Sequence, residues 1–168
     1  MVDLEYKELL KSKVKKFIDS GFKIKQSQLN KLLFDFQKHI VTLAILKGRF
    51  AIFADCGLGK TFMQLEWSRL VNWKTKKPVL ILAPLTVVAQ TIREGKRFDI
   101  KVVKASYNKE HPHFAPIQIA NYEQLDNIDV SIYSGIVLDE SSILKNFTGK
   151  YKKQIIDLFK DTPYEGLS

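Results

Sequence analysis

Apolar positions along the chain follow two patterns that alternate with each other. Spacings of three and four residues predict helices at residues 10–18, 31–47, 60–73, 86–98 and 149–160. Short unbroken apolar runs predict strands at residues 50–54, 78–83, 101–104, 116–121 and 135–140. Strands that alternate with helices indicate a mostly parallel sheet with helices on both faces. The pattern therefore predicts an α/β fold.

Capping residues indicate where the first two helices begin and end. Gly21 is suited to end the first helix and Gly48 the second, and either Ser27 or Asn30 is the expected N-cap of the second. We expect a short helical N-terminal extension at residues 1–30 and a single α/β domain at residues 31–168, a length that can bury one core.

The composition is that of a soluble globular protein with a basic surface. The chain has 168 residues, of which 45% are hydrophobic and 27% charged, and its formal net charge is +9. A charge of this size favours an anionic partner, most commonly nucleic acid, although a lysine-rich surface can also serve solubility alone. A single cysteine, the absence of a secretory signal and the absence of a long apolar run lead us to expect a cytoplasmic protein.

A glycine-rich stretch follows the strand predicted at residues 50–54. "ADCGLGKT" (residues 54–61) matches the phosphate-binding pattern G-x-x-x-x-G-K-[ST] except that alanine takes the first position. Gly57 and Gly59 allow consecutive N–H groups to face an anion at the start of the next helix. Lys60 would then reach the β- and γ-phosphates, and the Thr61 hydroxyl would bind Mg²⁺. The alternative is an ordinary glycine turn, with Cys56 only filling space in the loop.

Two carboxylates follow the clearest predicted strand, "GIVLDE" (residues 135–140). Asp139 would hold Mg²⁺ through its water shell, and Glu140 would act as the general base for an attacking water. Taken alone, an acidic pair in this place also suits the beginning of a helix. The phosphate loop upstream favours the catalytic interpretation.

Several motifs resemble those of the first motor lobe of superfamily-two helicases, and they occur along the chain in the same order as in that family. The chain is most similar to the Snf-type ATPases and their phage-encoded or bacterial relatives, over residues 33–168. "FDFQKHIV" resembles the adenine-sensing Q motif, and residues 54–61 resemble motif I. "LAPLTVVAQ" and "IANYEQL" resemble motifs Ia and Ib, and "LDESSILKN" resembles motif II with its Snf-type Lys-Asn extension. The resemblance implies a RecA-like P-loop NTPase lobe that uses ATP and Mg²⁺.

The resemblance also implies roles for individual residues. It assigns contacts with ATP to Gln37, Cys56, Gly57, Leu58, Gly59, Lys60 and Thr61. It assigns Mg²⁺ to Thr61 and Asp139, and catalysis to Lys60 and Glu140. It assigns contacts with a sugar–phosphate backbone to Pro84, Leu85, Thr86, Asn121 and Tyr122. Each weaker motif also has an ordinary structural interpretation: a solvated Gln37, a strand-to-helix turn at residue 84, and Asn121 as a helix cap.

Two features depart from the family pattern. Ser141 and Ser142 take the place of the usual Ala-His pair of motif II. The final residues, "DTPYEGLS", resemble the start of the strand that carries the third motif, so we expect a second lobe in a longer chain or in a partner. Because that lobe supplies an arginine to the transition state, we expect very weak hydrolysis by the isolated chain.

Three functions compete at this point. The first is the ATP-binding lobe of an ATP-dependent DNA helicase or translocase. The second is a stand-alone nucleotide- or DNA-binding module that docks on a partner without catalysis. The third is a small-molecule P-loop kinase, which leaves the resemblances to motifs Ia and Ib unexplained.

Overall fold

The computed structural model describes residues 19–55, 57–105, 115–140 and 164–167, the last as backbone only. Its α-helices are α2 (Asp35–Lys47), α3 (Lys60–Thr75) and α4 (Leu85–Arg97). Its strands are β1 (Arg49–Ala51), β2 (Val79–Ala83), β3 (Val102–Lys104), β4 (Ile117–Asn121), β5 (Gly135–Leu138) and β6 (Tyr164–Leu167). Its 3₁₀ helices are η1 (Gln26–Gln28), η2 (Tyr122–Asn127) and η3 (Val130–Ile132).

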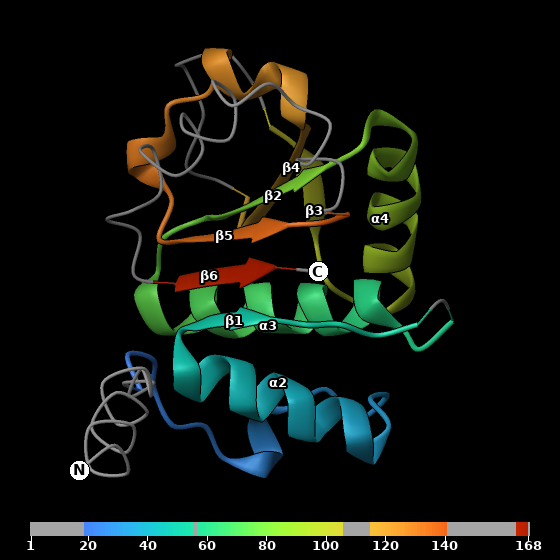
Figure 1. Ribbon diagram of the computed structural model, residues 1–168, viewed down its shortest axis with the longest axis vertical. Coiled ribbons are helices and arrows are strands. Elements are labelled where there is room, and N and C mark those ends of the chain that lie inside the picture. The colour runs from blue at the N-terminus through green and yellow to red at the C-terminus, as the bar shows by residue number, and fades with distance from the viewer. Residues whose placement is uncertain (1–18, 56, 106–114, 141–163, 168) are drawn as a thin grey trace, which may run out of the picture.

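The strands form one parallel sheet in the order β1-β6-β5-β2-β4-β3. Helices α3 and α4 lie against the sheet, and α2 packs on α3 (Figure 1). The predicted α/β fold is therefore confirmed. None of the helices among the described residues is long and apolar enough to cross a membrane.

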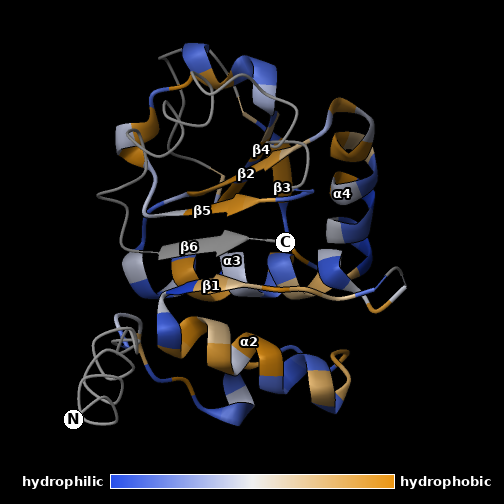
Figure 2. Cartoon of the chain, viewed as in Figure 1, coloured by the Kyte–Doolittle hydropathy of each residue, from blue (hydrophilic) through white to orange (hydrophobic). Residues whose placement is uncertain are grey.

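Strand β2 separates two parts of the hydrophobic core. Val79, Ile81 and Ala83 face the core shared with the α-helices, whereas Leu80 and Leu82 face the core shared with η2. Because neighbouring residues of a strand point to opposite faces, a strand covered on both faces is apolar throughout. The central strands are accordingly coloured as hydrophobic in Figure 2.

The second predicted helix begins later than expected. Helix α2 starts at Asp35 with Phe34 as its N-cap residue, so the prediction of Ser27 or Asn30 as the cap was wrong. The Asn30 side chain instead accepts from the N–H of Leu32 and donates to the carbonyl of Phe98. The helix ends as predicted, at Gly48, whose φ of 76° is a left-handed conformation that glycine adopts readily.

The described part of the N-terminal extension packs onto the domain. The N–H groups of Ser20, Gly21 and Phe22 donate to carbonyls in the last turn of α2. Leu29 is buried in the main core. The predicted boundary at residue 30 stays a prediction. The helices predicted at residues 10–18 and 149–160 lie outside the described residues.

Candidate functional site

The candidate residues gather at one edge of the sheet. The loop of residues 54–61 follows β1, and residues 84–86 follow β2. Asn121 ends β4 and Tyr122 begins η2, and residues 139–140 follow β5. All of these strands are parallel, so their carboxyl ends share one edge (Figure 1). Ligands of open α/β sheets bind at this edge.

The loop leads directly into the first turn of α3. Gly57 and Gly59 have φ values of 85° and 75°, which favour glycine, and a Cβ atom on Gly59 would collide with the Gln37 amide. Gly59 is the N-cap residue of α3, and because glycine has no side chain it does not cap the first N–H groups of the helix. These groups and the helix dipole suit an anion. Cys56 lies outside the described residues.

The loop lysine bends back across the loop. Lys60 Nζ donates to the carbonyl oxygen of Ala54 at 2.7 Å. The bond uses only the backbone of Ala54, so an alanine in the first loop position does not interfere with it. A phosphate oxygen in the loop would compete with this carbonyl for the ammonium group, and charge-assisted bonds of that kind are the stronger ones.

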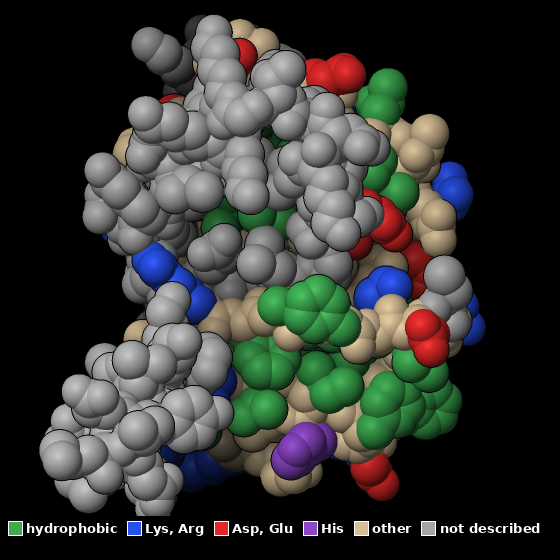
Figure 3. Space-filling view, in the orientation of Figure 1, with side chains coloured by type: hydrophobic (Ala, Val, Ile, Leu, Met, Phe, Trp, Pro, Cys, Tyr) green, Lys and Arg blue, Asp and Glu red, His purple; other side chains and the backbone are tan. Residues whose placement is uncertain are grey.

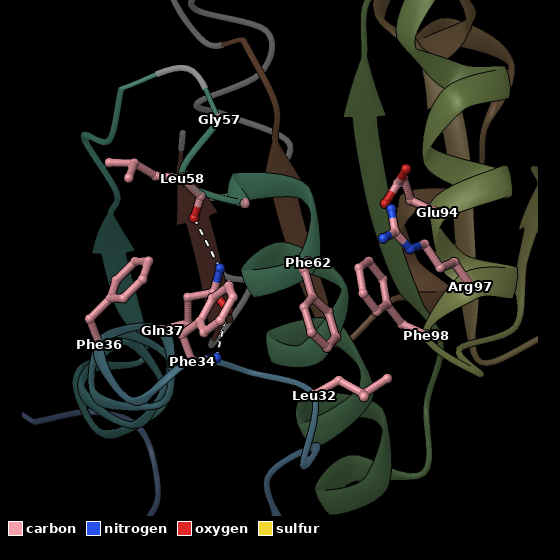
Figure 4. Close-up of a pocket in the computed structure, with 11 residues that line it drawn as sticks. Leu32, Phe34, Phe36, Gln37, Gly57, Leu58, Phe62, Glu94, Arg97 and Phe98 are labelled. Carbon is pink, nitrogen blue, oxygen red and sulfur yellow. Dashed lines mark hydrogen bonds between the residues drawn. The ribbon is translucent and has the colours of Figure 1, made fainter.

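Gln37 joins helix α2 to the loop. Its side chain is 4% exposed, its Oε1 accepts from the N–H of Phe34 at 3.0 Å, and its Nε2 donates to the carbonyl of Leu58 at 3.0 Å. Both bonds are drawn in Figure 4. The interpretation of Gln37 as a solvated helix residue is therefore wrong. A bond to adenine stays a prediction, and it would require Gln37 to exchange or share one of these partners.

A pocket of about 600 Å³ opens beside the loop. Figure 4 shows Phe34 and Phe36 on one side of it and Phe62 and Phe98 on the other. The Phe62 and Phe98 rings are stacked, with centroids 3.6 Å apart and an interplanar angle of 5°. Aromatic walls of this kind suit a flat, partly apolar ring.

These four aromatic residues were not predicted from the sequence. The clustering of two phenylalanines beside the glutamine in "FDFQ" was a usable signal for one wall. The other wall had no signal, because Phe62 lies on α3, Phe98 directly follows α4, and the two meet only in the folded chain. Figure 3 shows hydrophobic side chains gathered over α2 and β1 on the face of the molecule that it draws.

Asp139 is held from several directions at the end of β5. Its N–H donates to the carbonyl of Leu82, and its own carbonyl accepts from the Tyr122 hydroxyl at 2.7 Å. Its Oδ1 atom accepts from Gln64 Nε2 at 2.9 Å and from the N–H of Glu140 at 3.0 Å. Gln64 lies one helical turn after Lys60, so the carboxylate packs against the helix that follows the glycine-rich loop.

Glu140 differs from its neighbour in exposure and backbone conformation. Its side chain faces solvent, and its φ of 52° is uncommon for a residue other than glycine. Strained residues of this kind occur often at functional sites. The two adjacent carboxylates therefore have different surroundings, as their predicted roles require.

The donor set fits a magnesium ion that arrives with a phosphate. Among the described residues, no group of three or more His, Cys, Asp and Glu side chains could form a metal site by itself. Magnesium is usually held by one or two carboxylates together with phosphate oxygens and water. Asp139 and the hydroxyl of Thr61, the second residue of α3, are ligands of the right chemistry.

The residues predicted to contact nucleic acid fall into two groups. Leu85 and Thr86 are exposed at the start of α4, and Pro84 is partly exposed. Asn121 and Tyr122 are buried. Burial, together with the charges of the two acidic residues after β5, raises the pKa of the Tyr122 phenol. The Tyr122 hydroxyl donates to the Asp139 carbonyl, and contact between a nucleic acid and Asn121 or Tyr122 stays a prediction.

Comparison with solved structures identifies the fold. The chain superposes on the Sulfolobus solfataricus SWI2/SNF2 ATPase core in complex with dsDNA with a TM-score of 0.69 and 19% identity, over 86% of this chain and 33% of that one. It superposes on the UvsW helicase from bacteriophage T4 with a TM-score of 0.67 and 19% identity, over 80% and 51% of the two chains. For the Pyrococcus furiosus Hef helicase domain the TM-score is 0.65 and the identity 20%, over 83% and 34%.

These similarities establish a RecA-like fold of the kind found in helicase lobes. The chain spans between one third and about half the length of these three structures. No protein-family model matches the sequence, and no curated protein matches it.

Proposed function

We propose that the chain is the ATP-binding first lobe of an ATP-dependent DNA helicase or translocase of Snf type. The observation that carries the proposal is the hydrogen bond between Gln64 and Asp139. It brings the acidic end of β5 against the helix whose N-terminus the glycine loop forms. A glycine turn with no ligand gives no reason for a buried carboxylate in this position.

The nucleotide would occupy two connected regions. The adenine ring fits the aromatic pocket beside Gln37, which shares the residues Gly57, Leu58 and Gly59 with the loop. The phosphates fit the N–H groups at the start of α3. Lys60 would exchange the Ala54 carbonyl for a phosphate oxygen. Cys56 would contribute only its backbone.

The two acidic residues would divide the remaining work. Magnesium, held by Thr61 and Asp139, would neutralise phosphate charge when bound. The Gln64 amide and the N–H of Glu140 donate to the Asp139 carboxylate and orient it. Glu140 would accept the proton of the attacking water, and its exposure gives that water access.

Nucleic acid would bind at the same sheet edge. The exposed residues Leu85 and Thr86 lie after β2, and the net charge of +9 favours a phosphate backbone. A second lobe, in a longer chain or in a separate partner, would supply the transition-state arginine, which is worth roughly 10³–10⁵ in rate. The isolated chain would then bind ATP but hydrolyse it very slowly.

Calorimetry with Mg²⁺ and a non-hydrolysable ATP analogue tests nucleotide binding. Lys60→Ala should weaken binding about 10- to 100-fold, because a hydrogen bond to a charged group contributes roughly 1.5–3 kcal/mol. Lys74→Ala, at the other end of α3, is the matched control and should bind like the wild type. Absence of binding by the wild type, or equal binding by Lys60→Ala, would contradict the proposal.

The alternative is a binding module without catalysis. Hydrolysis measured after addition of a second lobe distinguishes the two, since the motor proposal requires Lys60-dependent turnover. Function that survives Lys60→Ala would favour the module.

A further inference from the structure

We propose that Gln64 is a positioning residue that sets the orientation of the Asp139 carboxylate for magnesium. The inference rests on the proposed nucleotide site. Gln64 is buried on α3, and its Nε2 atom donates to Asp139 Oδ1 at 2.9 Å across 75 residues of sequence. Neither the phosphate-loop pattern nor the acidic pair in the sequence includes it.

The position of Gln64 on α3 links the Asp139 carboxylate to Lys60. Residues four apart lie on the same face of an α-helix, so Gln64 lies one turn below Lys60. A single rigid helix therefore carries the lysine for the phosphates and the amide for the metal carboxylate. Ser68, in the next turn, donates its hydroxyl to the Gln64 carbonyl and continues the same line of contacts.

The chemistry of an amide suits this place. A carboxylate that is 6% exposed needs hydrogen-bond donors in place of water, and Asp139 receives them from Gln64 and from the N–H of Glu140. A lysine or arginine would also satisfy the carboxylate, but its positive charge would repel Mg²⁺. A second carboxylate would repel Asp139. A neutral donor leaves the full negative charge of Asp139 to the metal.

The other contacts of Asp139 fix its backbone, whereas Gln64 restrains the rotation of its side chain. Leu82 and Tyr122 hold the N–H and the carbonyl of Asp139, so its backbone is already fixed. Removing the Gln64 amide would take away one of the donors that orient the carboxylate and leave the backbone contacts of Asp139 in place. The loss should therefore appear in metal binding more than in the fold.

The experiment measures how strongly magnesium improves nucleotide binding. The dissociation constant of a non-hydrolysable ATP analogue is measured by calorimetry with Mg²⁺ and again with EDTA, and the ratio of the two is the magnesium coupling. Gln64→Met replaces the amide with an apolar side chain of similar length. Its coupling should fall about 10-fold or more, since partners that orient metal ligands typically contribute 10- to 100-fold in affinity. The affinity in EDTA should stay within about twofold of the wild type.

Gln118→Met is the matched control. Gln118 is also a buried glutamine, but it lies on β4 and accepts from the Tyr133 hydroxyl, away from Asp139. This variant should lose thermal stability and keep the wild-type magnesium coupling. A role for Gln64 in stability alone would make the two variants behave alike.

The outcomes separate the two proposals. A wild-type protein without magnesium coupling overturns the proposed function and this inference together. Wild-type coupling that persists in folded Gln64→Met overturns the inference alone. If Gln64→Met does not fold, as judged by circular dichroism, Gln64→Asn replaces it, because the shorter amide cannot span the bond to Asp139. Unchanged coupling in Gln64→Asn then overturns the inference.

Discussion

Replacement of Glu66 by glutamine should destabilise the domain measurably. Glu66 is completely buried on α3. Its Oε1 atom accepts from the N–H of Asn30 and from Arg69 Nη2, both at 2.8 Å, and its Oε2 accepts from Arg69 Nε at 2.7 Å. Arg69 Nη2 also donates to the carbonyl of Gln28. The pair thus holds the chain segment before α2 against α3.

The expected loss follows from these contacts. Glutamine keeps one acceptor for Asn30 but turns an NH₂ group toward the guanidinium of Arg69. The bond to Glu66 is the main cause that raises the pKa of Arg69, so the two groups interact strongly in the folded state. A hydrogen bond between charged groups contributes roughly 1.5–3 kcal/mol. Because the Arg69 side chain is 35% exposed, water compensates part of the loss, and we expect about 2 kcal/mol.

Thermal unfolding followed by circular dichroism is the assay. For a domain of this size, a loss of about 2 kcal/mol corresponds to a decrease of about 4–8 °C in Tm. Asp35→Asn is the control, because Asp35 forms an ion pair of the same spacing with Lys38 but is 99% exposed. It should leave Tm unchanged within error. A Glu66→Gln protein that melts within a degree of the wild type would refute the reasoning.

Three further predictions concern the glycine-rich loop, Tyr133 in the part of the core beside η2, and nucleic acid. Gly59→Ala should weaken nucleotide binding more than Gly57→Ala: both have positive φ, but only at Gly59 does the added Cβ meet Gln37. Equal losses would contradict this. Burial raises the pKa of Tyr133 to about 12, so the stabilisation from its neutral phenol is complete below pH 10 and is lost as the pH rises towards 12. The wild type should therefore lose more Tm than Tyr133→Phe over that range, and parallel curves would exclude the effect. Binding of a fluorescent DNA oligonucleotide should weaken at least about tenfold between 50 and 200 mM salt, and salt-independent binding would count against backbone contacts.

Local sequence determined most of the elements and the types of chemistry. The apolar runs of β2, β4 and β5 were readable because strands covered on both faces contain little else. The glycines of the loop were readable because their backbone conformations are costly for other residues. The acidic pair was readable because it ends such a strand. These features depend on neighbouring residues in the chain.

Boundaries and burial were harder to read. Helix α2 begins at Asp35 because the Gln37 side chain accepts from the N–H of Phe34, although Asn30 is the better cap by residue type. The motif around Tyr122 predicted a residue at the surface, yet Tyr122 is buried and its hydroxyl donates to the carbonyl of Asp139. In each case a competing hydrogen bond decided the outcome.

Only the tertiary structure decided which distant residues meet. Parallel strands carry the ends of β1 and β5 to one edge, where Gln64 meets Asp139. The packing of α4 beside α3 places Phe98 on Phe62 and so forms one wall of the pocket. The sequence alone predicts which groups are suited to bind phosphate or metal, because that depends on residue type and backbone freedom. The distances between these groups depend on how elements far apart in sequence pack together, and a local sequence pattern does not predict that packing.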